Sequence, residues 1–397
     1  MRILHVVPYY DQAWAYGGIP RLVTTMTRAL ARRGHHVTVC TTDARDERTR
    51  ASQVDNTHGV DVRMFRNVSN SLAYHLQFFT PVGLRRYMRH AAKTFEIAHI
   101  HACHNLPGVI AASELSRAGV PYLVSPNGTA LPIERRIAAK RLFAGTAGRS
   151  FLSGAARIAA VSQAEVRQLR SLGIAESVII RISNPIDDRE CDHPADPGSF
   201  RSRLALGDGP IVLFLGKLTP RKGVGDLVRA FARVGHSAAV LVIAGNDMGA
   251  RRSVEALVKQ LGLRERVMFT GLLSGNVRLD ALAAATVVVY PSRDEIFGLV
   301  PLESLLCGTP VVVCDDSGCG EVISSTGGGQ TVPYADVGRL ARAIEAVLDD
   351  EHSWRCRARA AAIVVRRRYG ADVICDELES LYRSVVDRTP APCRIGA

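Results

Sequence analysis

The chain alternates short apolar runs with longer stretches that mix apolar and polar residues. The runs are rich in Val, Ile and Leu, which is typical of strands buried on both faces of a parallel sheet. The stretches between them repeat apolar residues at the period of an amphipathic helix, as residues 371–387 do with Ile374, Leu378, Leu381 and Val385. The pattern therefore predicts an α/β protein built from parallel sheets.

Two series of strands follow from this pattern. The first half predicts strands at residues 2–8, 36–41, 60–65, 95–101, 121–126, 157–162 and 178–182. The second half predicts strands at residues 211–215, 239–244, 267–270, 286–290 and 311–313. Since 397 residues are too many for one ordinary core, we expect more than one domain. The expected division is an N-terminal domain over 1–187, a polar linker over 188–200, a C-terminal domain over 201–369 and a last helix over 370–388.

The stretch from Pro291 to Pro310 lies between two of the apolar runs and predicts a strand–loop–helix–strand unit. Ligands of such sheets bind at the carboxyl ends of strands, where helices begin. The helix opens at Phe297, Gly298 and Leu299. Their backbone amides, together with the helix dipole, predict an anion site.

Two carboxylates bracket the start of this helix. Glu295 and Glu303 are separated by just over two helical turns, so both can face one ligand. A carboxylate can accept hydrogen bonds from the vicinal hydroxyls of a ribose or a sugar ring. Spacing alone favours a plainer alternative, in which Glu303 is a surface helix residue and Glu295 an acid of the first turn.

A basic loop follows the strand at 211–215. Lys217, Arg221 and Lys222 lie between Gly216 and Gly223, at the carboxyl end of the strand. Cations in a glycine-flanked loop suit a diphosphate, and the alternative is an ordinary exposed basic loop. The spacing does not fit a Walker A loop.

The first half offers weaker signals. Gly17 and Gly18 separate the first strand from a helix and predict either a close approach to a phosphate or sugar, or a simple tight turn. The strand at 95–101 ends in His99 and His101, which invites a zinc interpretation. No fourth ligand is suitably spaced, so we expect no metal.

The formal net charge is +12, which suggests an anionic partner such as a nucleotide, a nucleic acid or an anionic lipid surface, or else simply an arginine-rich exterior. Two basic segments, 84–93 and 132–158, fit either an amphipathic helix on an anionic membrane or a solvated helix face. Aromatic residues make up only 6%, and nucleic-acid binding is therefore disfavoured.

The compartment is predicted from the cysteines and from the start of the chain. The nine cysteines are odd in number and contain no Cys-x-x-Cys pair, which favours reduced thiols in a cytosolic protein. The first strand lacks the long apolar region of a signal peptide, and no apolar run is long enough to span a bilayer. We expect a cytoplasmic protein, with the inner face of the membrane as a candidate location.

The segment EIFGLVPLE, from Glu295 to Glu303, resembles the E-x-F-G-x-x-x-x-E signature of family-4 retaining glycosyltransferases. The CGTPVVV segment that follows is also similar to that family. The resemblance extends from the Gly17 loop to the last helix. It implies the GT-B fold, in which two Rossmann-like domains face each other across a cleft and the final helix packs back on the first domain.

The resemblance also implies site residues. Lys217 and Lys222 take the places of the cations that hold the leaving diphosphate, with Arg221 beside them. Glu295 would bind the donor sugar and Glu303 the ribose. The remaining donor contacts would come from backbone or loop positions: Gly17, Gly18, Gly271, Leu272, Phe297, Gly298 and Leu299.

Three further positions follow from the same resemblance. His101 and Asn105 are acceptor-side candidates. Asn127 stands where many relatives carry a histidine that contacts the donor sugar. Asparagine can hydrogen bond to a sugar hydroxyl but cannot titrate near neutral pH, so a proton-transfer role at this position is in doubt.

The activity implied is transfer of a sugar, with retention, from a nucleoside diphosphate sugar to a hydroxyl of a glycan, lipid-linked or small-molecule acceptor. UDP- and GDP-linked donors are the first candidates, and no cofactor is expected. The chain has no Asp-x-Asp, which argues against a metal-bridged diphosphate. The alternatives are a GT-B epimerase or phosphorylase, a non-catalytic protein that binds nucleotides or nucleic acid, and a transferase that binds without transferring.

Overall fold

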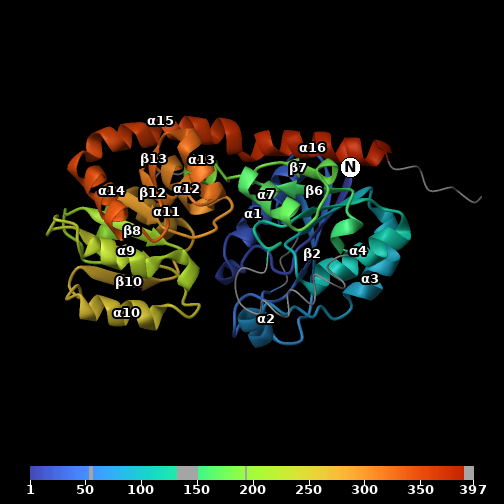
Figure 1. Ribbon diagram of the computed structural model, residues 1–397. Coiled ribbons are helices and arrows are strands. Elements are labelled where there is room, and N and C mark those ends of the chain that lie inside the picture. The colour runs from blue at the N-terminus through green and yellow to red at the C-terminus, as the bar shows by residue number, and fades with distance from the viewer. Residues whose placement is uncertain (53–56, 132–150, 193–194, 389–397) are drawn as a thin grey trace, which may run out of the picture. The chain divides into compact units, whose positions relative to one another are not determined.

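The computed structural model describes residues 1–52, 57–131, 151–192 and 195–388. The chain forms two compact units, shown in Figure 1. The first contains residues 1–185 and the segment from Ala371 onward, and the second contains Ile186–Gly370. The final helix therefore belongs to the first unit although the second precedes it in the chain.

The first unit is built around a parallel seven-stranded sheet in the order β3-β2-β1-β4-β5-β6-β7. Its strands are β1 (Arg2–Val6), β2 (His36–Thr42), β3 (Val60–Phe65), β4 (Ile97–His101), β5 (Tyr122–Ser125), β6 (Arg157–Ala160) and β7 (Ile179–Arg181). Its helices include α1 (Gly18–Arg32), α2 (Asn70–Leu76), α3 (Leu84–Ala91), α4 (Leu106–Ala118), α7 (Gln163–Ser171) and α16 (Ala371–Arg388).

The second unit holds a parallel six-stranded sheet in the order β10-β9-β8-β11-β12-β13. Its strands are β8 (Ile211–Leu215), β9 (Val240–Ala244), β10 (Val267–Gly271), β11 (Val287–Tyr290), β12 (Val311–Cys314) and β13 (Gly329–Val332). Its helices are α8 (Pro197–Arg203), α9 (Val224–Phe231), α10 (Arg251–Gln260), α11 (Asn276–Ala284), α12 (Leu299–Leu306), α13 (Gly318–Thr326), α14 (Val337–Asp349) and α15 (Glu351–Tyr369).

Local sequence explains many of these boundaries. Ser162 caps α7, since its hydroxyl accepts a hydrogen bond from the Glu165 amide, as the sequence predicts. The apolar runs of β11 and β12 are fully buried, as both faces of a parallel sheet require. Ile374, Leu378, Leu381 and Val385 of α16 are buried too, which confirms the amphipathic pattern of the last helix.

Strand β13 and helix α8 were not expected from the sequence. Strand β13 begins Gly329-Gln330 and has a low strand propensity. It forms because it pairs with β12 along its length, and tertiary context outweighs propensity there. Helix α8 begins inside the expected linker 188–200 and extends past its end. Its cap residue Asp196 donates its amide to Asp280 of α11, which fastens this stretch to the second unit.

The basic segment at 84–93 is partly helical. Helix α3 buries Leu84 and Met88 and exposes Arg85 and Arg89, which approach the buried carboxylate of Glu114 at 3.8 Å each. Most of the second basic segment, 132–158, lies outside the described residues. None of the described helices combines the length and apolar character that crossing a membrane requires.

Candidate active site

The second sheet has a topological switch point between β8 and β11. From β8 the chain continues to β9 on one side, whereas β11 lies on the other. The loops after these two strands, 216–223 and 291–298, are those that the sequence predicts as a diphosphate and sugar site. Open α/β sheets bind their ligands at such a point.

The two loops are bonded to each other. The Arg293 amide donates to the Arg221 carbonyl at 2.9 Å, and an Arg221 guanidinium nitrogen lies 3.3 Å from the Asp294 carbonyl. Gly223 has φ +67°, and a Cβ there would lie 2.2 Å from the Pro291 carbonyl oxygen. A glycine is therefore required where the loops approach.

Lys222 and Glu295 form the centre of this site. Lys222 is only 5% exposed, and its ammonium group donates hydrogen bonds to a Glu295 carboxylate oxygen and to the Tyr290 hydroxyl, the latter at 2.5 Å. The same carboxylate oxygen accepts from the Ser292 hydroxyl at 3.0 Å. The Lys222 nitrogen also lies 4.6 Å from the centre of the Tyr290 ring.

Glu295 is ionised in this setting. Burial raises the pKa of its carboxyl, but Lys222 and Arg221 more than offset that effect and lower the pKa to about 2. Lys222 thus meets a full negative charge in the absence of ligand. An anion that binds here must draw Lys222 from Glu295 or share it.

The helix after this loop starts as the sequence predicts. Gly298 precedes α12 with φ +79°, and no side chain of the described residues caps the helix there. A Cβ at Gly298 would lie 2.5 Å from the Cys319 sulfur, so the loop and α13 meet closely at this position. Phe297 is buried and packs edge-on against Tyr369, with ring centres 5.5 Å apart.

Glu303 is not a surface residue, so the plainer alternative for it is wrong. It is 4% exposed, and Arg278 of α11 donates to it at 2.5 Å. Arg278 is itself buried and also donates to Glu190 at 2.8 Å. Glu295 and Glu303 are therefore held by different cations, and sequence reasoning missed Arg278 because it lies 25 residues before Glu303 in a separate helix.

Other predicted donor positions lie at the ends of strands. Lys217 is half-buried just after β8. Gly271 ends β10 with φ +74°, and its carbonyl accepts from the Gly245 amide at 2.8 Å. Leu272 follows with 48% of its surface exposed. Their contacts with a nucleotide stay predictions.

The first sheet has its own switch point, between β1 and β4, and Gly17 and Gly18 follow β1. Gly17 precedes α1 with φ +103°. The residue before it, Tyr16, stacks on Tyr9 with ring centres 4.7 Å apart and packs against Tyr74 and Phe79. This aromatic cluster fixes the backbone that leads into the Gly17 loop.

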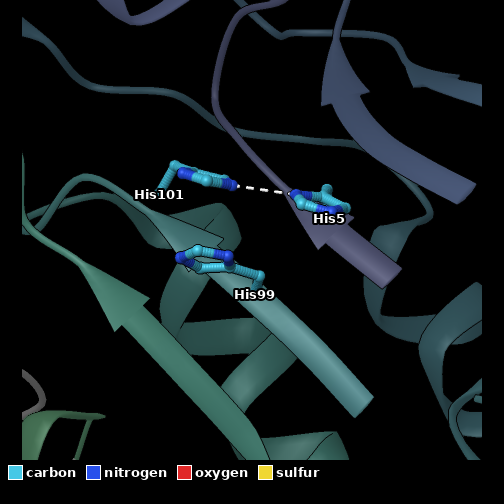
Figure 2. A group of neighbouring side chains, drawn as sticks. All are labelled: His5, His99 and His101. Carbon is cyan, nitrogen blue, oxygen red and sulfur yellow. Dashed lines mark hydrogen bonds between the residues drawn. The ribbon is translucent and has the colours of Figure 1, made fainter. Parts of the chain in front are cut away.

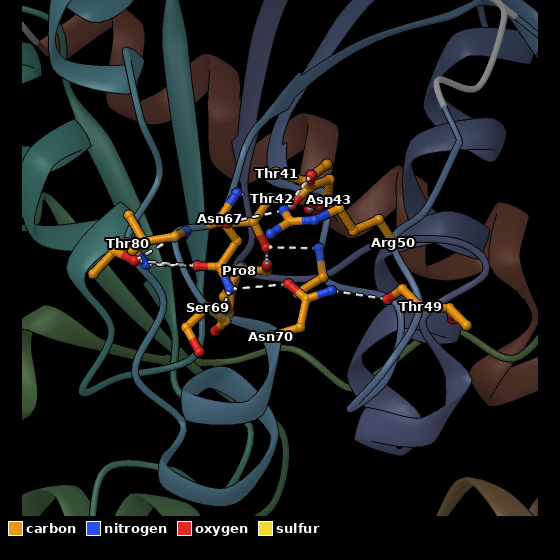
Figure 3. A network of polar contacts seen from close by, with 12 residues as sticks. Pro8, Thr41, Thr42, Asp43, Thr49, Arg50, Asn67, Ser69, Asn70 and Thr80 are labelled. Atoms are coloured by element: carbon orange, nitrogen blue, oxygen red, sulfur yellow. Dashed lines mark hydrogen bonds and ion pairs between the residues drawn. The ribbon is translucent and has the colours of Figure 1, made fainter.

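A polar network supports the segment that supplies Tyr74 and Phe79 (Figure 3). Asp43 accepts from the Arg50 side chain at 2.7 Å and from the Asn67 amide at 2.7 Å. The Asn67 side chain in turn accepts from the Thr80 amide at 2.8 Å and donates to Asn70 at 3.2 Å. The network ties the loops after β2 and β3 together.

The predicted acceptor-side residues lie in the interior of the first unit. His101 is fully buried, which argues against contact with an acceptor. Asn105 caps α4, because its side-chain oxygen accepts from the Gly108 amide at 2.7 Å while its NH₂ donates to the Ala102 carbonyl at 2.9 Å. Both ends of the Asn105 amide are therefore used within the fold.

Figure 2 shows His101 beside His99 and His5. Sequence reasoning missed His5 as a neighbour of the other two histidines. Potential ligand atoms of the three lie within 4.8 Å of one another. His5 and His101 share a hydrogen bond of 3.0 Å, and His99 contacts Tyr382 and Ser125 at 2.7 Å each.

The geometry of the three rings does not suit a metal. The rings of His99 and His101 stack at 4.3 Å with 27° between their planes, whereas imidazoles that coordinate one ion direct their in-plane lone pairs at a common point. Burial lowers the pKa of all three, that of His99 to about 3. We interpret the group as a stack of neutral, hydrogen-bonded histidines.

Asn127 follows β5 with a left-handed φ of +51°. Its side-chain NH₂ donates to the Ser125 carbonyl at 3.3 Å, and its oxygen is buried without a partner among the described residues. The next residue, Gly128, donates its amide to Glu165 at 2.6 Å. Sequence reasoning missed Glu165, although a charged residue on the apolar side of α7, one turn before Leu169, was the available signal.

Comparison with known proteins decides the family. A model of glycosyl transferases group 1 matches residues 198–363, and one of Glycosyltransferase Family 4 matches residues 16–190. A D-inositol 3-phosphate glycosyltransferase from Acidothermus cellulolyticus is 31% identical, over 96% of this chain and 89% of the relative. This chain belongs to the family-4 glycosyltransferases.

Two solved structures show the same fold as this glycosyltransferase. Sucrose-phosphate synthase from Thermosynechococcus elongatus superposes with a TM-score of 0.79 at 23% identity, covering 97% of this chain and 99% of the other. The Anabaena protein Alr3699/HepE, solved with UDP and glucose, gives 0.78 at 20% identity, covering 97% and 100%. The fold is GT-B, which confirms the expectation from the resemblance.

Proposed function

We propose that this glycosyltransferase moves a sugar, with retention, from a nucleoside diphosphate sugar to a hydroxyl acceptor without a metal ion. The observation that carries the proposal is the Lys222–Glu295 pair between the two loops at the switch point of the second sheet. It brings a buried cation of one loop to an ionised carboxylate of the other, a few residues before the start of α12, which no described side chain caps.

The mechanism follows from where charge develops. Departure of the sugar leaves negative charge on the diphosphate, and cations or amides fixed in advance are the strongest means of stabilising it. Lys222 would supply the fixed cation, because Tyr290 and Glu295 already hold its ammonium group. Lys217 and Arg221 would add positive charge, and the amides of Gly298 and Leu299 would donate hydrogen bonds.

The carboxylates would recognise hydroxyls. Glu295 would share its charge between Lys222 and the donor sugar, and Glu303, oriented by Arg278, would bind the ribose. Asn127 would offer its unpaired oxygen to a sugar hydroxyl. Because Asn127 cannot take up a proton near neutral pH, the acceptor's proton would go to the departing phosphate oxygen.

The nature of the donor and acceptor is proposed from relatives. One structural neighbour binds UDP and glucose, so UDP-glucose is the first donor to try. One curated relative is a D-inositol 3-phosphate glycosyltransferase, so D-inositol 3-phosphate leads the acceptor panel. Glycan and lipid-linked acceptors belong in the same panel. Contact of the α3 arginines with an anionic membrane stays a prediction, as does the cytoplasmic location.

The test is to incubate the protein with labelled UDP- and GDP-sugars, with and without acceptors, in EDTA. We expect one donor to be consumed only when an acceptor is present, and NMR of the product to show the anomeric configuration of the donor. Donor consumption without any acceptor would instead indicate an epimerase. An inverted product, or a requirement for a divalent ion, would contradict the proposed mechanism.

A further inference from the structure

Glu165 is fully buried on α7, and both of its carboxylate oxygens accept hydrogen bonds from backbone amides. Oε1 accepts from Gly128 at 2.6 Å, and Oε2 accepts from Val161 at 2.9 Å. Gly128 lies in the loop after β5, and Val161 follows β6. One side chain thus ties together the ends of two neighbouring strands.

The loop after β5 is held at several other points. The Thr129 hydroxyl accepts from the Cys103 amide at 2.7 Å and donates to the Pro126 carbonyl at 2.5 Å. A ring nitrogen of His104 lies 2.9 Å from the Ala130 carbonyl. Between these anchors, Asn127 takes a left-handed conformation that residues other than glycine adopt infrequently.

The restrained loop leaves one polar atom of Asn127 unused among the described residues. Its side-chain oxygen is buried and unpaired among the described residues, and a buried acceptor without a partner costs free energy. A hydroxyl group is the simplest donor that would satisfy it. The loop therefore holds a hydrogen-bond acceptor ready rather than completing a bond within the fold.

We propose that Glu165 is a positioning residue for sugar transfer: by holding the Gly128 amide, its carboxylate fixes the loop that presents Asn127 to a hydroxyl of the donor sugar. This role rests on the proposed function. It requires the ionised form, because a protonated carboxyl turns one of its two oxygens into a donor that faces an amide N–H.

Near pH 7, Glu165 is a mixture of the ionised carboxylate and the uncharged acid. Burial raises the pKa of Glu165 to about 7, although the bonds from Gly128 and Val161 act in the opposite direction. The ionisable group that faces it is the Cys103 thiol, which is neutral because burial raises its pKa to about 12. Within the part of the chain that the structure describes, Glu165 forms no ion pair.

The test is the pH profile of kcat/KM for the donor, which reports groups of the free enzyme. With a pKa near 7, about one tenth of Glu165 stays ionised at pH 6. Since the neutral form should keep about a tenth of the activity, wild-type kcat/KM should fall about fivefold from pH 8 to pH 6. Glu165→Gln should lower kcat/KM about tenfold at pH 8 and remove this fall, since a glutamine resembles the neutral acid at every pH.

Three controls make the result specific. Glu114→Gln removes another buried glutamate of the same unit, one held by Arg117 instead of by the loop, and should keep the wild-type profile. Thr129→Val should lower kcat/KM several-fold but keep the fall with pH, and it carries the test if Glu165→Gln does not fold. In an Asn127→Ala background, Glu165→Gln should have little further effect, because coupled residues are not additive.

The outcomes separate the two proposals. An active Glu165→Gln variant with the wild-type pH fall would overturn the role of Glu165 and leave the proposed function intact. Full additivity with Asn127→Ala, or wild-type kcat/KM in Thr129→Val, would also overturn it. Absence of donor consumption by the wild-type protein would overturn the proposed function, and this role with it.

Discussion

Glu295 in the second unit and Glu165 in the first are both largely buried glutamates, each near the carboxyl end of a parallel strand, yet their acidities shift in opposite directions. Lys222 and Arg221 lower the pKa of Glu295 to about 2, whereas burial raises that of Glu165 to about 7. The difference lies in the partners, which are cations for Glu295 and backbone amides for Glu165.

The two glutamates therefore represent two different ways of preparing a ligand site. The second unit pairs the ionised Glu295 with Lys222, so that an arriving anion meets a cation already held in place. The first unit keeps a carboxylate whose charge depends on pH and uses it to hold a loop. The first arrangement suits charge stabilisation and the second suits positioning.

The largest effect is expected at the Lys222–Glu295 pair. Lys222→Ala should lower turnover at least ~100-fold, about 3 kcal/mol of transition-state stabilisation, because it removes the fixed cation and leaves Glu295 unpaired. Steady-state kinetics measure this directly. Lys259→Ala, at an exposed lysine of α10, is the matched control and should keep wild-type turnover. Normal turnover in Lys222→Ala would remove Lys222 from the site.

The next effect tests the pH-dependent carboxylate through stability. Since folding raises the pKa of Glu165 from 4.5 to about 7, its neutral form stabilises the protein below pH 4.5, and this contribution is lost as the pH rises through 7. The stability of wild type relative to Glu165→Gln should therefore fall by about 2 kcal/mol between pH 5 and pH 8. Urea unfolding at both pH values measures the difference, and a constant difference would place the pKa elsewhere.

A smaller effect is expected at Glu303, the carboxylate within α12. Glu303→Ala should weaken nucleotide binding about tenfold, because a buried carboxylate that accepts hydrogen bonds from ribose hydroxyls is lost. Calorimetric titration with the nucleoside diphosphate measures this. Glu345→Ala, which removes a glutamate on α14 that accepts from the Gly235 amide, serves as the control. Unchanged affinity in Glu303→Ala would move the ribose contact to another residue.

The smallest effect is expected at Tyr290. Tyr290→Phe keeps the ring beside Lys222 and removes only the hydroxyl, so the Lys222–Glu295 pair remains. Turnover should fall by only a few-fold, consistent with the loss of the hydroxyl's hydrogen bonds to Lys222 and Glu295. A loss as large as that of Lys222→Ala would mean that the Tyr290 hydroxyl contacts the reacting groups. Tyr290 would then have the same role as Lys222 instead of a smaller one.

The sequence predicts the strands well, because buried parallel strands leave unbroken apolar runs that need no tertiary information. It also predicts the two loops at the switch point of the second sheet, since the signal of each loop, 216–223 and 291–298, lies within a few consecutive residues. The partners of these groups are harder to predict. Arg278 reaches Glu303 across 25 residues, and Glu165 reaches Gly128 across 37.

His101 illustrates the opposite error. Its position at the end of β4 resembles that of a ligand contact, but the register of β1 beside β4 pairs His5 with His99, and the His5 ring hydrogen bonds to His101 in the interior. Side-chain direction along a strand is predictable, whereas the depth at which the strand end is buried depends on the loops that cover it. Strand β13 was missed for a related reason, since its pairing with β12 outweighs its own glycine-rich sequence.

The most direct test of the central claim, that Lys222, positioned by Glu295, holds the diphosphate of the donor without a metal, is calorimetric titration of UDP and GDP in EDTA, with wild type and Lys222→Ala side by side. We expect one nucleotide to bind wild type in EDTA and to bind Lys222→Ala at least tenfold more weakly. Binding that requires a divalent ion, or equal affinity in the two proteins, would contradict the claim.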